Sequence, residues 1–289
     1  METGLVVVLC LALAAGVLLV IFNSVSTEAV KYRKNIEHIH FDDDTPLTED
    51  EFMRRLSLLQ LDKYWQKLSP FVKHEIAIEI TPCQEDALML GNSKTGGFPH
   101  LPKGESLPVD LILLAQINCA QAKEFDKDNL LPKEGMLYFF IDPEKIDEDI
   151  KDAVSVRYIS LLNGLPLQKA DISPEAESGL MQFSQRISLP EYDSDTIQVM
   201  LKDYEIDGYF KLTNKEHSHK LLGYPDTITQ NFIIDEEKVL LLQLDSEESC
   251  RLSWGNMGKL YVFIDKNKLN SLQFDDLYVH IQSYEQEKE

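Results

Sequence analysis

Cysteine is scarce in this chain of 289 residues, and its placement argues against the usual cysteine-based sites. Of four cysteines, Cys10 lies within an apolar N-terminal run, and Cys83, Cys119 and Cys250 stand singly with no CxxC pair. An odd number of scattered cysteines indicates neither a disulfide framework nor a cysteine zinc site. We therefore expect reduced, buried thiols.

Positive charge is also in short supply. The chain has 28 Lys and Arg against 49 Asp and Glu, a formal net charge of -21. Such a surface repels nucleic acid phosphates and anionic lipid headgroups, so nucleic-acid binding is not expected. Acidity promotes solubility, and it also suits a basic protein partner.

The signatures of several common enzyme classes are missing. The sequence contains no Gly-rich phosphate loop, no Gly-x-Ser-x-Gly elbow and no His-Glu-x-x-His motif. Two His-x-His pairs, His38 with His40 and His217 with His219, could each hold a metal if they lay on one face of a strand. Both pairs lie in polar stretches, so we favour solvated histidines and expect no cofactor.

A long apolar run is present at the N-terminus. Leu5 to Phe22 is 18 apolar or small residues without a charge. As a helix it would span about 27 Å, close to the roughly 30 Å hydrocarbon core of a bilayer. We predict a single-pass transmembrane helix within residues 1-24. A cleaved signal peptide is the alternative, but its apolar stretch is usually only ~7 to 15 residues and follows a basic start.

Charge next to this run predicts its orientation. Lys31, Arg33 and Lys34 follow it and no Lys or Arg precedes it, which places the body in the cytoplasm at the cell membrane. Residues 25-47, which include Asp42-Asp43-Asp44, are predicted to form a polar linker. Residues 48-289 form the folded domain.

That domain contains an internal duplication. Gly135 to Asp142 returns as Gly258 to Asp265, identical at six of eight positions, and a fixed offset of this kind indicates a repeated structural unit. Two further blocks match in the same order: Leu113 to Asn118 with Leu240 to Asp245, and Gly97-Phe98-Pro99 with Gly223-Tyr224-Pro225. We place the first half at about 70-150 and the second at about 187-284.

The local patterns predict an α+β fold with largely antiparallel sheets and a few helices. A capping box at Thr48 opens a helix that extends to about Leu68. His74 to Ile80 alternates polar and apolar residues as a half-buried strand does. In the segment Leu137 to Ile141 both faces are apolar, which predicts a strand covered on both sides.

The repeated blocks resemble the YwqG-like domain of unknown function, and so do Leu131-Pro132-x-x-Gly135 and Trp254-Gly255-x-x-Gly258. The resemblance extends from about Thr48 to Tyr284. The resemblance implies a bacterial-type duplicated α+β domain with no established reaction. Some members of that family are thought to sit beside polymorphic toxins, which implies an immunity-like role. The N-terminal anchor departs from the usual soluble pattern.

Gln116 and Gln243 are the most informative polar residues, because they occupy matched positions inside apolar strands. An unpaired buried amide costs ~1 to 3 kcal/mol, so we expect each to bond the neighbouring Gly-aromatic-Pro turn. Ligand binding is the alternative. Trp254 occurs in the second copy only and is expected to pack in the core. If a small-molecule site exists, we expect it in a cleft between the repeats, near Gln116, Gln243 and Trp254.

Two classes of function remain. The first is a membrane-anchored, non-enzymatic module that binds a protein, with a basic toxin as one candidate. The second is a ligand-binding domain or enzyme with its site in the cleft between the repeats. The missing catalytic motifs favour the first.

Overall fold

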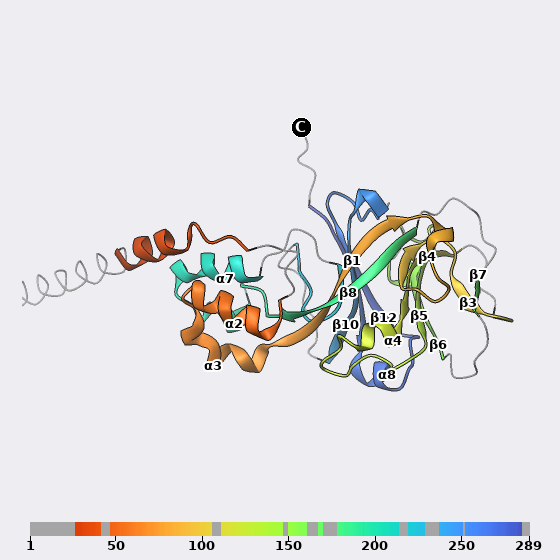
Figure 1. Ribbon diagram of the computed structural model, residues 1–289, viewed down its shortest axis with the longest axis horizontal. Coiled ribbons are helices and arrows are strands. Elements are labelled where there is room, and N and C mark those ends of the chain that lie inside the picture. Colours follow the sequence, from red (N-terminus) through yellow and green to blue (C-terminus); the bar gives the residue numbers. More distant parts are fainter. Residues whose placement is uncertain are drawn as a thin grey trace, which may run out of the picture. The chain divides into compact units, whose positions relative to one another are not determined.

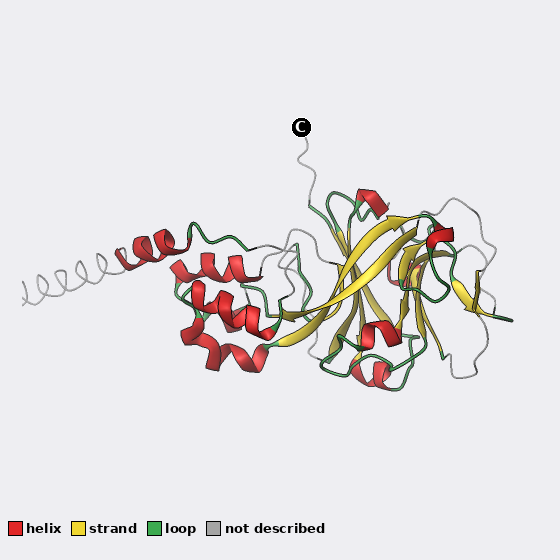
Figure 2. Ribbon diagram, viewed as in Figure 1, coloured by secondary structure: helices red, strands yellow, loops and turns green. Residues whose placement is uncertain are grey.

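The structure is a computed structural model, shown in Figures 1 and 2. It describes residues 27-41, 47-105, 111-146, 150-160, 167-169, 178-192, 194-213, 219-228, 237-250 and 252-284. These residues form two compact units. The helical unit comprises the described parts of 1-45, 50-70 and 192-214, and the sheet unit comprises those of 46-49, 71-191 and 215-289.

The helical unit is built from three separate stretches of the chain. Its elements are a helix over 27-36, α2 (Glu49–Leu58), η1 (Asp62–Tyr64), α3 (Trp65–Leu68), α6 (Asp195–Gln198), η4 (Asp203–Glu205) and α7 (Ile206–Thr213). The predicted helix from Thr48 to Leu68 is therefore interrupted, and it continues as η2 (Ser69–Phe71). Phe52 and Leu56 of α2 are buried, as expected from their spacing of four residues on one helix face.

Part of the predicted linker 25-47 is helical. Tyr32 and Ile36 are four residues apart on the helix over 27-36, and both are buried. The hydroxyl of Tyr32 donates to the backbone oxygen of Leu59 at 2.9 Å and lies against Gly208, where a Cβ atom would collide with it. The polar composition of this segment concealed a narrow apolar stripe.

The helices that the structure describes are too short or too polar to cross a membrane. The predicted span from Leu5 to Phe22 lies outside the described residues, as does the acidic run Asp42-Asp43-Asp44. Membrane anchoring and its orientation therefore stay predictions.

The sheet unit contains a ten-stranded sheet in the order β12-β11-β10-β9-β1-β8-β2-β4-β5-β6, with antiparallel neighbours throughout. Its strands are β1 (Lys73–Cys83), β2 (Lys94–Gly96), β4 (Ile112–Asn118), β5 (Met136–Ile141), β6 (Val154–Ile159), β8 (Ser178–Ser188), β9 (His219–Leu222), β10 (Lys238–Asp245), β11 (Lys259–Asp265) and β12 (Leu277–Gln282). A two-stranded sheet pairs β3 (His100–Pro102) with β7 (Leu167–Lys169). Short helices are η3 (Glu85–Ala87), α4 (Cys119–Lys123), α5 (Ile150–Ala153), η5 (Glu248–Cys250) and α8 (Lys266–Asn270). The predicted α+β class with a largely antiparallel sheet is confirmed.

The strand order displays the duplication. Outward from the central pair of β1 and β8, one side continues β2, β4, β5 and β6 and the other continues β9, β10, β11 and β12. The repeated segment thus forms β5 on one side and β11 on the other. The first strand of each half is exchanged, because β1 borders the second-half strands and β8 borders the first-half strands.

Alternating residues of these strands build two apolar layers. On β5, Leu137, Phe139 and Ile141 enter the main hydrophobic cluster, to which both halves contribute. Tyr138 and Phe140 point to the opposite face, where Leu101 of β3 packs against them. The predicted two-sided burial is confirmed.

The sheet curls until its edges approach each other. The rings of Tyr158, on the edge strand β6, and Phe274, which precedes the other edge strand, lie 6.1 Å apart between centroids. The short helix α5 also packs against β12. The inner face of this nearly closed sheet holds the main hydrophobic cluster, and the alternating side chains Tyr138 and Phe140 lie on the outer face.

Candidate functional site

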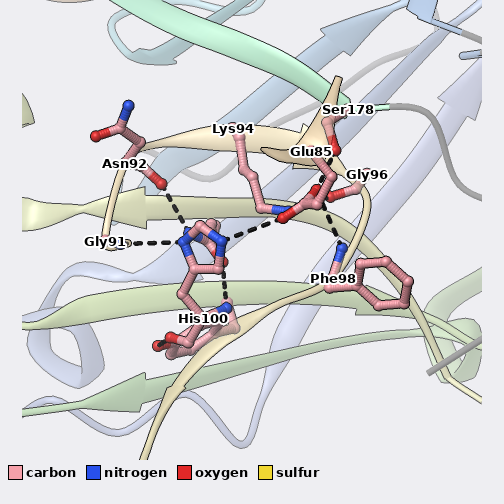
Figure 3. A network of polar contacts seen from close by, with 10 residues as sticks. Glu85, Gly91, Asn92, Lys94, Gly96, Phe98, His100 and Ser178 are labelled. Atoms are coloured by element: carbon pink, nitrogen blue, oxygen red, sulfur yellow. Dashed lines mark hydrogen bonds and ion pairs between the residues drawn. The ribbon is translucent and has the colours of Figure 1, made fainter. Parts of the chain in front are cut away.

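Two lysines are buried at matching positions of the two halves. Lys94 on β2 and Lys220 on β9 each stand three residues before a Gly-aromatic-Pro turn, and their exposed fractions are 0% and 1%. A buried ammonium group requires partners, because desolvation of an unpaired charge is very costly. The Nζ atom of Lys94 donates to both carboxylate oxygens of Glu85 at 3.0 and 2.8 Å and to the backbone oxygen of Gly96 at 3.0 Å (Figure 3).

Lys220 is paired with two carboxylates instead of one. Its Nζ atom lies 2.9 Å from Glu75 on β1 and 2.8 Å from Asp226 in the segment after β9. Burial alone would lower the pKa of Lys220, but the charges of Asp226 and Glu75 outweigh burial and raise it. Lys220 is therefore a charged group in the interior of the fold.

Glu85 is the centre of the contacts around Lys94. Its carboxylate also accepts hydrogen bonds from the hydroxyl of Ser178, from His100 Nε2 at 3.1 Å and from the backbone N–H of Phe98 at 3.4 Å (Figure 3). Burial alone would raise the pKa of Glu85, but the hydrogen bonds from Lys94 and Ser178 and the charge of Lys94 hold it below the ordinary value. The carboxylate is thus ionised at neutral pH.

His100 is fully buried, and its contacts define its protonation state. Its Nδ1 atom accepts the backbone N–H of Gly91 at 3.0 Å, and the Nε2 atom of Gln116 lies 3.1 Å from it. An acceptor nitrogen carries no proton, so the proton is on Nε2, which faces Glu85. His100 is therefore assigned as a neutral imidazole.

The two glutamines bond the turns, as the sequence predicted. Gln116 Oε1 accepts the backbone N–H of His100 at 2.9 Å, and its Nε2 donates to the backbone oxygen of Asn92 at 2.7 Å. Gln243 Oε1 accepts the backbone N–H of Asp226 at 3.0 Å, and Gln243 Nε2 donates to the side-chain carboxylate of Asp226 at 3.1 Å. His100 and Asp226 both directly follow a Gly-aromatic-Pro sequence, so the same backbone group is held in each half.

A tyrosine completes each arrangement. Tyr138 on β5 donates its hydroxyl to the backbone oxygen of His100 at 2.5 Å, and Tyr261 on β11 donates to that of Asp226 at 2.7 Å. Burial raises the pKa of both tyrosines, so both remain donors. We refer to these sets as the first network (Glu85, Lys94, His100, Gln116, Tyr138, Ser178) and the second network (Glu75, Lys220, Asp226, Gln243, Tyr261).

The two glutamines of the predicted site lie far apart along the sheet. Gln116 on β4 and Gln243 on β10 are separated by four intervening strands, roughly 24 Å along the sheet at about 4.8 Å per strand. Trp254, between β10 and β11, is buried in the main hydrophobic cluster, as expected for core packing. Among the described residues, no hydrogen-bond partner reaches its indole N–H.

Of the histidine pair His217 and His219, the structure describes only His219. His219 Nδ1 accepts the backbone N–H of Asp245 at 3.0 Å, and its Nε2 lies 2.7 Å from Glu247, so both ring nitrogens are engaged within the chain. His217 lies outside the described residues. Within the described ranges, no group of three or more His, Cys, Asp or Glu side chains could hold a metal ion. A metal at this pair stays a prediction.

The lysines were not identified from the sequence, although a signal was present. Lys94 and Lys220 open the same pattern, Lys-x-x-Gly-aromatic-Pro, in the two copies. The glutamate partners gave no such signal, because Glu75 and Glu85 both lie within the first half and have different spacings from the lysines. A repeated lysine beside a repeated turn would have been enough to predict a paired charge.

Comparison with known families identifies the domain. The sequence matches the domain of unknown function DUF1963 over residues 93–283, about two thirds of the chain. The chain belongs to the DUF1963 family. The DUF1963 match contains both buried lysines and both glutamines, whereas Glu75 and Glu85 precede it. No curated protein matches the chain. The predicted assignment to a domain of unknown function is confirmed, and the narrower YwqG-like name rests on the sequence motifs.

Replacing Gln243 with leucine is expected to destabilise the DUF1963 domain by about 1 to 3 kcal/mol. The substitution removes a fully buried amide that accepts the N–H of Asp226 and donates to its carboxylate, and losing such hydrogen bonds costs about this much. Urea denaturation monitored by circular dichroism measures the change. Gln273→Leu, at an exposed position, is the matched control and should be close to neutral. Equal stability of the two variants would contradict the role assigned to Gln243.

Glu85→Gln is expected to show a pH-dependent loss of stability. Because the pKa of Glu85 is lowered on folding, its ionised form stabilises the protein above its unfolded-state pKa of about 4.3, and this contribution disappears as the pH falls below that value. The difference in urea midpoint between wild type and variant should therefore be largest near neutral pH and shrink below about pH 4. A difference that stays constant between these limits would refute the assignment.

Proposed function

We propose that this DUF1963 protein is a membrane-anchored, non-enzymatic module that binds a basic protein. The observation that supports this best is that the polar side chains of both networks are bonded to one another and to the two turns. His100 is hydrogen-bonded to both Glu85 and Gln116, and these two side chains accept backbone N–H groups in and next to the first turn. In the second half, Asp226 contacts both Lys220 and Gln243, and Gln243 also accepts its backbone N–H. Such groups stabilise two turns on the outer face of the sheet, which is a scaffold role.

Charge supports a basic partner. With a net charge of -21, the chain attracts positively charged proteins over a distance of about 10 Å at moderate ionic strength and repels other polyanions. A basic toxin is the partner class suggested by the immunity-like role that the sequence resemblance implies. In this proposal Leu5 to Phe22 anchors the protein in the cell membrane with its body in the cytoplasm.

Binding is tested with the full chain in detergent. The tagged protein is incubated with lysate of its own cells at about 0.05 M salt, and retained proteins are identified and then titrated in purified form at rising salt. We expect a basic protein whose affinity falls steeply toward about 0.5 M salt. If no protein is retained, or if affinity does not depend on salt, the proposal fails.

Anchoring is tested separately. The full chain should stay in the membrane pellet after alkaline carbonate extraction, whereas Leu13→Arg combined with Ala14→Arg should release it. Each arginine at the centre of a membrane helix opposes insertion by roughly 3 kcal/mol. Extraction of the unaltered chain by carbonate would rule out the anchor and leave the binding proposal standing.

A further inference from the structure

The connection between β1 and β2, residues 84-93, carries two exposed apolar side chains on a firmly held segment. Met89 is 73% exposed and Leu90 is 51% exposed. The residue before them, Leu88, is buried, so the segment packs against the sheet unit immediately next to its exposed tip. Adjacent apolar residues at such exposure gain nothing for the folded chain alone.

The first network holds one end of this connection. Glu85 lies in η3, and its carboxylate is bonded to Lys94, Ser178 and His100 (Figure 3). Lys94 and His100 are fully buried, and through Ser178 the carboxylate also ties the connection to β8. The chain entering the tip is therefore fixed by charged hydrogen bonds, which are stronger than neutral ones.

The same network holds the other end. The N–H of Gly91 donates to His100 Nδ1 at 3.0 Å, and the backbone oxygen of Gly91 accepts from Asn118 Nδ2 at 2.9 Å. The backbone oxygen of Asn92 accepts from Gln116 Nε2 at 2.7 Å. A bond from the N–H of Asn92 to the oxygen of Met89 at 3.1 Å closes a β-turn, with Gly91 at a φ of 87°.

We propose that Met89 and Leu90 form a docking tip that inserts into an apolar pocket of a protein partner, with basic side chains at the rim of the pocket. This inference rests on the proposed function and assigns the surface that carries it. A tip held at both ends loses little conformational freedom on binding, which favours affinity. Methionine adapts its shape to a pocket, and the exposed Asp86, three residues before Met89 in the sequence, adds to the negative charge of this part of the chain.

A protein fits this tip better than a lipid surface does. Apolar side chains on a loop can also insert into a membrane, but such insertion is usually assisted by basic residues that attract anionic headgroups. Here the chain carries a net charge of -21, which opposes that approach. The same charge assists docking to a basic protein.

Site-specific photo-cross-linking tests the tip in the full chain. A photoreactive amino acid is placed at Met89 in one variant and at Met257, which is 71% exposed, in the control, and both are irradiated in the cells that produce the protein. We expect one protein to be captured at position 89 in at least about tenfold excess over position 257. Capture of lipid alone, equal capture at both positions, or no capture at either would overturn the inference.

Affinity measurements with the captured protein separate this inference from the proposed function. Met89→Ser combined with Leu90→Ser should weaken binding at least about tenfold, because two apolar side chains lose their burial, whereas Met257→Ser should not change it. If a basic protein binds the wild type in a salt-dependent manner and binds the double variant equally, the docking tip is wrong and the proposed function stands. If the wild type binds no protein, the proposed function fails as well.

Discussion

Replacing Lys220 with methionine is expected to lower the free energy of unfolding by about 3 to 5 kcal/mol, because it breaks a buried ion pair by removing one partner. Glu75 is almost fully buried, and in the variant its carboxylate faces the interior without the ammonium group that lies 2.9 Å away in the wild type. Asp226 loses the same partner at 2.8 Å. Urea denaturation, with the slope checked for constancy, measures the loss.

Two further variants show whether the loss arises from the broken charge pairing. Combining Lys220→Met with Glu75→Gln should recover part of the stability, since the second change removes the negative charge that faced the ammonium group. Lys145→Met is the matched control, because the Lys145 side chain is 50% exposed and lies 3.1 Å from Asp142. It should cost less than about 1 kcal/mol. A Lys220→Met variant no less stable than Lys145→Met would show that the pair contributes little.

The pH dependence of this effect has a definite sign. The pKa of Lys220 is raised on folding, so the charged lysine stabilises the protein fully below its unfolded-state pKa of about 10.4 and loses this contribution as the pH rises beyond it. The stability gap between wild type and Lys220→Met should therefore stay constant around neutral pH and narrow only in strong alkali. A gap that narrows between about pH 6 and 8 would point to another group.

Local patterns in the sequence predicted the elements of this fold well. The repeated segment became β5 and β11 because alternation of apolar residues specifies both the strand and its two faces. The glutamines were predicted correctly for a similar reason. An amide inside an apolar strand needs a partner, and the nearest repeated feature in both copies is the turn that Gln116 and Gln243 bond.

Long-range pairing was not predictable in the same way. The exchange of β1 and β8 pairs Lys73 with Ser188, which are far apart in the sequence. Neither strand contains a pattern that predicts which strand it will pair with. For the same reason the lysine networks were missed: Lys220 meets Glu75 only because β9 lies beside β1. The helix over 27-36 was taken for a linker because two buried side chains among charged ones make a weak stripe.

Gly97 is a position at which an added side chain would collide with the first network. Its φ of 64° lies in the left-handed region, which other residues adopt only with strain. A Cβ atom there would lie 2.8 Å from Lys94 Nζ and still closer to Glu85 Oε2 and Ser178 Oγ. These three polar atoms converge on the space that a side chain would fill. Glycine is thus required at this position for two reasons: the turn needs a positive φ, and the polar atoms of the first network leave no space for a side chain.

Gly97→Ala should therefore destabilise the protein by about 3 kcal/mol or more, since strain in the backbone adds to displacement of a buried ion pair. Gly104→Ala separates the two terms, because Gly104 has a φ of 97° but open space around its Cβ position. It should cost only about 1 kcal/mol. Ser178→Ala, introduced beside Gly97→Ala, should recover part of the loss by removing one colliding oxygen. An equal loss of unfolding free energy for Gly97→Ala and Gly104→Ala in urea denaturation would mean that the side chains of the first network move aside easily. The rigid support inferred for Met89 and Leu90 would then be wrong as well.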